Sequence, residues 1–70
     1  MENSMRNVRS AIYPKDVAII TGKSVKSAAR LIQKIKDAFG KDHHQILTIN
    51  EFCDYMGIRF KDIENSLNLD

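Results

Sequence analysis

Residues 16–39 read DVAIITGKSVKSAARLIQKIKDAF, and this stretch decides the fold. It predicts two helices joined by a tight turn at Gly22, a residue that adopts left-handed backbone angles without steric cost. Ser24 is a good N-cap for the second helix, which we predict over residues 25–39. Gly40 then supplies the stop signal.

Helical periodicity divides this second helix into two faces. The apolar face collects six residues: Val25, Ala28, Leu31, Ile32, Ile35 and Phe39. The opposite face holds four cations and one carboxylate among polar side chains: Lys23, Lys26, Ser27, Arg30, Gln33, Lys34 and Asp37. We expect the apolar face to join the core and to keep the cationic face in water.

Local signals predict three more helices, over residues 14–21, 49–56 and 60–67. Pro14 suits a first helical position, because the amide hydrogen that it lacks is not needed there. Thr48 and Glu51 have the spacing of a capping box, and Gly57 ends the helix that they begin.

The two halves of the chain echo each other when Gly22 is aligned with Gly57, 35 residues later. Each half then reads as helix, glycine turn, helix. We therefore predict an all-α domain of four helices over residues 11–70, built from two tandem helix-turn-helix units. Residues 1–10 are predicted to be a flexible N-terminal arm.

A short apolar pair precedes each unit, at residues 12–13 and 47–48. Pairing of the two as a small antiparallel ribbon, or a wing over residues 41–47, stays open as an addition to the helices. The aromatic residues fall at apolar-face positions, so we expect them in the core rather than on a stacking surface: Tyr13, Phe39, Phe52, Tyr55 and Phe60.

Charge is distributed unevenly along the chain, although the net charge is only +2. Residues 1–41 hold nine cations and three acids, a net of +6, whereas residues 42–70 hold two cations and six acids, a net of −4. With 43% apolar residues and 70 residues in all, the chain is long enough for one small core. The basic half favours a polyanionic partner.

The residues around the glycine turn resemble the helix-turn-helix of bacterial and phage repressors. Ala18 stands at the small-residue position of the first helix, four residues before the turn glycine, Gly22. Val17, Ala28 and Leu31 occupy apolar positions of the pattern, whereas Thr21 and Lys23 depart from it. The resemblance implies that the second helix enters the major groove of DNA.

The chain is also similar to excisionase-type winged proteins, in which a basic loop, a short strand and a further helix follow the helix-turn-helix. His43, His44 and Gln45 stand where such a wing would begin, and Thr48 to Glu51 where its following helix would start. Over residues 13–58 it further resembles small uncharacterised helix-turn-helix proteins of mobile bacterial elements.

These observations predict a double-stranded DNA-binding protein, a transcriptional regulator or an accessory factor of a mobile element, without a cofactor. The predicted DNA contacts are Lys23, Ser24, Lys26, Ser27, Arg30, Gln33, Lys34, Lys41, His43 and His44. The alternative is a protein-interaction adaptor that uses the acidic C-terminal helix pair. A homodimer or a protein partner through these C-terminal helices is also open.

Other classes of function fit the sequence less well. We expect no enzyme, because no nucleophile elbow, phosphate loop or paired acids occur. Asp42, His43, His44 and Cys53 lack the spacing of a closed zinc site, so no metal is expected. The longest apolar run, residues 17–20, is too short to span a membrane. The single cysteine suits the reducing cytoplasm, where we expect the protein.

Overall fold

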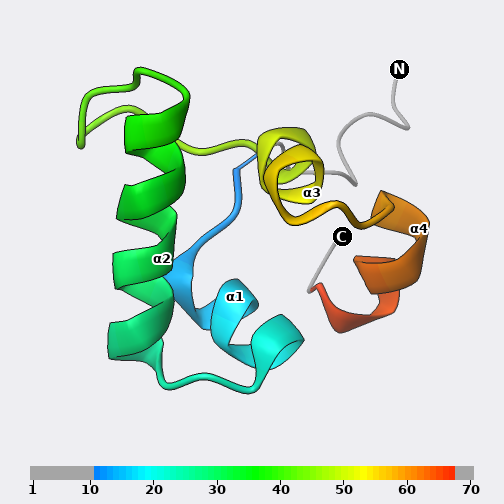
Figure 1. Ribbon diagram of the computed structural model, residues 1–70. Helices are drawn as coiled ribbons and strands as arrows, with labels where there is room; N and C mark the ends of the chain where they lie inside the picture. The colour runs from blue at the N-terminus through cyan, green and yellow to red at the C-terminus, as the bar shows by residue number, and fades with distance from the viewer. Residues whose placement is uncertain (1–10, 68–70) are drawn as a thin grey trace, which may run out of the picture.

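The computed structural model describes residues 11–67, so the predicted arm at residues 1–10 lies outside the described residues. Four α-helices are formed: α1 (Pro14–Thr21), α2 (Val25–Ala38), α3 (Ile49–Met56) and α4 (Phe60–Ile63). A 3₁₀ helix, η2 (Glu64–Ser66), continues directly from α4. In Figure 1, α2 lies along one side of the molecule, α1 packs beside it, and α3 and α4 lie on the other side. The all-α prediction is confirmed.

The glycine turn between α1 and α2 has the predicted geometry. Gly22 adopts a φ of 75°, and its N–H donates to the Ala18 carbonyl at 2.8 Å, which closes α1. The Ser24 hydroxyl then accepts the Ser27 N–H at 3.1 Å as the N-cap of α2. Helix α2 ends one residue earlier than predicted, because Phe39 is its C-cap.

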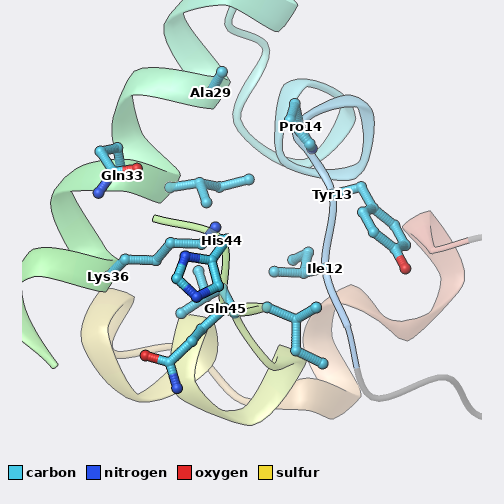
Figure 2. A pocket seen from close by; sticks show the side chains of 11 residues that line it. Ile12, Tyr13, Pro14, Ala29, Gln33, Lys36, His44 and Gln45 are labelled. Carbon is cyan, nitrogen blue, oxygen red and sulfur yellow. The ribbon is translucent and has the colours of Figure 1, made fainter. Parts of the chain in front are cut away.

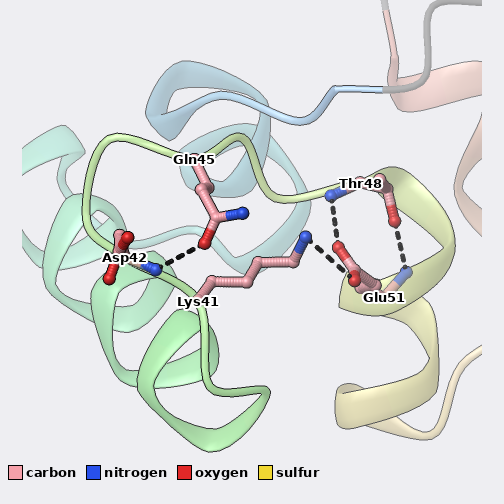
Figure 3. A network of polar contacts seen from close by, with 5 residues as sticks. All are labelled: Lys41, Asp42, Gln45, Thr48 and Glu51. Atoms are coloured by element: carbon pink, nitrogen blue, oxygen red, sulfur yellow. Dashed lines mark hydrogen bonds and ion pairs between the residues drawn. The ribbon is translucent and has the colours of Figure 1, made fainter.

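Helix α3 begins at the predicted capping box (Figure 3). The Glu51 N–H donates to the Thr48 hydroxyl at 3.0 Å, and the Thr48 N–H donates to the Glu51 carboxylate at 2.9 Å. Gly57, with a φ of 72°, ends the helix. Both bounds of α3 agree with the prediction, because the signals that set them are local in sequence.

The predicted helix over residues 60–67 is wrong in its second half. Regular α-helix stops at Ile63, and the chain tightens into the 3₁₀ turn of η2. Such tightening is frequent at the C-terminal ends of helices, where few i to i+4 hydrogen bonds are available. Ile63 and Leu67 are nevertheless both buried, as their spacing predicts.

The predicted ribbon is reduced to one contact. Ala11 and Thr48 form an isolated antiparallel bridge, and the Ile12 N–H donates to the Leu47 carbonyl at 2.9 Å. The second half does not copy the first in detail, since α2 has 14 residues and α4 has four. The tandem arrangement therefore remains a prediction.

The core lies where α1, the middle of α2, and α3 meet. Its members are Ile12, Val17, Ala28, Ile32, Ile35, Leu47, Ile49, Phe52, Cys53, Ile63 and Leu67. Phe52 is the largest fully buried side chain among the described residues. Because these residues cover one side of α2 only, the opposite side of that helix is left to solvent.

Several residues predicted for the core are exposed. Val25 and Phe39, at the two ends of α2, keep 55% and 42% of their surface in solvent. A helical wheel gives the direction of a side chain, but it does not show how far the neighbouring elements extend along the helix. The core residues of α2 lie between Ala28 and Ile35, and the ends extend past them. Tyr13 and Tyr55 are also exposed, so the prediction of an aromatic core holds fully only for Phe52, with Phe60 half-buried.

Candidate nucleic-acid interface

The predicted cationic face of α2 lies in solvent. Lys26, Arg30 and Lys34 are exposed on the side of the helix opposite the buried Ala28, Ile32 and Ile35, and Lys23 is exposed in the turn before them. We refer to Lys23, Lys26, Arg30 and Lys34 as the cationic ridge. Among the ion pairs of residues 11–67, none uses a member of the ridge.

The ridge concentrates positive charge along one line. Lys26, Arg30 and Lys34 follow one another at intervals of four residues, about 6 Å along the helix axis. Like charges at this spacing destabilise a helix by about 0.2–0.5 kcal/mol for each pair. An anion that lies along the ridge relieves this repulsion, so the surface is suited to a line of negative charges.

Polar side chains accompany the ridge, and two of them already have partners. The Ser24 hydroxyl oxygen accepts the N-cap hydrogen bond, which leaves its own hydrogen able to donate to a ligand. Gln33 donates through Nε2 to the Asp37 carboxylate at 3.0 Å. Ser27 is half-buried on the flank of the helix. Ser24 is therefore the most available of the predicted hydroxyl and amide contacts.

Lys41, a predicted DNA contact, is directed toward α3 and away from the ridge. Its Nζ lies 3.1 Å from the Glu51 carboxylate, and both side chains are half-buried (Figure 3). Burial raises the pKa of Glu51, but the hydrogen bonds from Thr48 and Lys41 and the charge of Lys41 outweigh it and leave the pKa below its ordinary value. The ion pair neutralises the lysine within the fold.

Hydrogen bonds hold the loop over residues 41–46 in place. The Asp42 N–H donates to the Gln45 side-chain oxygen at 2.7 Å, and the Gln45 N–H donates to the Asp42 carbonyl at 3.0 Å. Lys36 fastens the loop to α2 by donating to the His43 carbonyl at 2.8 Å. In the described part of the chain this loop has no paired strands. It is a turn held by hydrogen bonds and not a two-stranded wing.

The two histidines of this loop project into solvent. His43 and His44 are both exposed, and their rings meet edge to face with centroids 5.5 Å apart. The Asp42 carboxylate lies 4.0 Å from His44 Nε2. The loop thus presents imidazole donors beside α2, at the opposite end from Lys23.

A groove of about 260 Å³ separates α2 from the loop and from the chain entering α1 (Figure 2). Its walls are mainly apolar, and four polar side chains line it as well: Gln33, Lys36, His44 and Gln45. The sequence did not reveal this groove, because residues from three separate segments form it. It borders the cationic ridge through Gln33.

Within residues 11–67, no cluster of three or more metal-ligating side chains is formed. Cys53 is buried in α3, and burial, with a smaller contribution from the charge of Asp54, raises the pKa of its thiol. No helix of the described residues is long and apolar enough to cross a membrane.

Four exposed residues of α2 were not among the predicted contacts: Val25, Ala29, Asp37 and Ala38. Val25 was assigned to the core, and Ala29 was assigned to neither face. Their exposure depends on how far neighbouring helices extend along α2, which the periodicity of the sequence does not contain. Comparison of the chain with protein-family models, curated proteins and solved structures finds no significant match.

Proposed function

We propose that the protein binds double-stranded DNA through the exposed face of α2, as a transcriptional regulator or an accessory factor of a mobile element. The observation that carries the proposal is the cationic ridge itself. Its four cations are exposed and take part in none of the ion pairs of the described residues. Residues 42–67, the described part of the acidic half, do not cover them.

The dimensions of the face fit a duplex. The major groove of B-DNA is about 12 Å wide and admits one α-helix. In the bound state, Lys23 and Lys34 contact phosphates at the two ends of the inserted helix, and Lys26 and Arg30 reach base edges. A guanidinium recognises guanine through two parallel hydrogen bonds, so Arg30 is the strongest candidate for base recognition. His43 and His44 lie beside the helix and supply further phosphate contacts.

Binding to random duplex DNA, measured over a range of salt concentrations, tests this proposal. On random duplex DNA, which offers no preferred bases, all four cations of the ridge contact phosphates, and this gives a slope of log K against log salt of about −3.6, since each contact contributes about −0.9. Duplex RNA of the same length is the matched control, because its deep, narrow major groove excludes a helix while its charge is similar. Absence of DNA binding at low salt contradicts the proposal, and so does equal affinity for the two duplexes.

A protein-binding role of the C-terminal half is the second candidate. Tyr55 and Met56 of α3 are exposed large apolar residues, and the acidic Asp54 and Glu64 are exposed in the same half. Aromatic and methionine side chains are enriched in protein interfaces. A protein that acts only as such an adaptor shows no salt-dependent affinity for DNA in the same titration.

A further inference from the structure

Two apolar side chains stand in solvent beside the cationic ridge. Val25 is 55% exposed in the first turn of α2, and Ala29 is exposed one turn later. Each directly precedes a member of the ridge, Lys26 and Arg30 respectively, and therefore lies about 100° from it around the helix. A hydrocarbon stripe thus runs along the edge of a surface suited to a polyanion.

The positive charges of Lys26 and Arg30 determine which partner can bind the apolar stripe of Val25 and Ala29. A second copy of the same surface would bring Lys26 and Arg30 against like charges, which disfavours self-association through it. The major groove of DNA offers both negative phosphates and an apolar group on its floor, the C5-methyl group of thymine. Val25 and Ala29 are the side chains of this surface that complement that methyl group.

We propose that Val25 and Ala29 read thymine by packing against its C5-methyl group, while Lys26 and Arg30 make the polar contacts. This inference rests on the proposed DNA binding and adds a sequence preference to it. The sites bound most tightly contain thymine opposite the first two turns of α2. A buried methyl contributes a factor of about three to four in affinity.

Replacing thymine with uracil removes this methyl group and leaves the base pairing intact, so it isolates the contact. The full chain is first used to select tight-binding sequences from a random duplex pool. Each thymine of the best sequence is then replaced singly with uracil. We expect a loss of about three- to fourfold at one or two adjacent positions and none elsewhere.

The variants Val25→Ser and Ala29→Ser assign the effect to residues. Both positions are exposed, so the fold is retained, and thermal unfolding of each variant verifies this. In Val25→Ser the cost of uracil should fall below about 1.5-fold at one of the sensitive positions, and Ala29→Ser should act on the neighbouring one. Ile19→Ser is the matched control, because Ile19 is an exposed apolar residue of α1 outside the proposed interface, and it leaves the uracil effect unchanged.

The outcomes separate this inference from the proposed function. Steeply salt-dependent DNA binding with no uracil effect overturns the thymine contact alone. A uracil effect that persists in both serine variants also overturns it. Absence of any DNA binding overturns both proposals. A change of oligomeric state in Val25→Ser identifies a second copy as the partner of the stripe and excludes the thymine contact.

Discussion

Alanine at both Lys26 and Arg30 should weaken binding to random duplex DNA by at least about tenfold and reduce the salt slope by about 1.8, because the variant loses two phosphate contacts. The two side chains are exposed, lie one helical turn apart on α2, and take part in no ion pair of residues 11–67. Their removal therefore breaks no ion pair of the described residues, and it relieves the charge repulsion within the ridge. Fluorescence anisotropy with a labelled duplex at several salt concentrations measures both quantities.

Lys61→Ala is the matched control for this double variant. Lys61 is also an exposed cation, but it lies on α4, away from the ridge. The Lys61→Ala variant lowers the net charge by one without altering the proposed interface. Its salt slope should therefore stay within experimental error of the wild type. A slope that is unchanged in the Lys26 and Arg30 variant as well would remove the ridge from the binding mechanism.

Alanine at Phe52 should destabilise the fold by about 3–5 kcal/mol, which is typical of a large aromatic residue removed from a core. Phe52 is 0% exposed and packs in the cluster that joins α1, α2 and α3. A domain of this size has only about 5 kcal/mol of stability. Most of the native population should then be lost, and the thermal midpoint should fall by more than about 12 °C.

Tyr55→Ala provides the comparison on the same helix. Tyr55 is an aromatic residue of α3 that keeps 40% of its surface exposed, so its removal should change stability by less than about 1 kcal/mol. Circular dichroism during heating distinguishes the two variants. A midpoint in Phe52→Ala within about 5 °C of the wild type would show that the core is centred elsewhere. Loss of DNA binding in Phe52→Ala accompanies unfolding, unlike the loss in the Lys26 and Arg30 variant.

The helix boundaries that the sequence predicted correctly depend on local signals. Helix α1 begins at Pro14, α3 begins after the capping box of Thr48 and Glu51, and each ends at a glycine with positive φ. A cap requires only residues within four positions of each other, so the sequence contains the whole interaction. The exposure of the cationic ridge was predicted for the same reason, since it is the reverse side of a regular apolar pattern.

The features that were predicted wrongly, or not at all, depend on contacts between distant segments. Val25 and Phe39 have the right periodicity for the core, but they lie at the two ends of α2 and keep 55% and 42% of their surface exposed. Lys41 looks like a free cation in the sequence, and only the fold brings Glu51 within 3.1 Å of it. The groove beside α2 is formed by residues from three segments, so no single stretch of sequence predicts it.

An amide chemical-shift map recorded while duplex DNA is added measures directly whether DNA contacts the exposed face of α2. If DNA binds this face, we expect the largest shifts at residues 23–34, smaller shifts at His43 and His44, and almost none in α4. Shifts concentrated in α3 and α4, with residues 23–34 unchanged, would contradict DNA binding by this face.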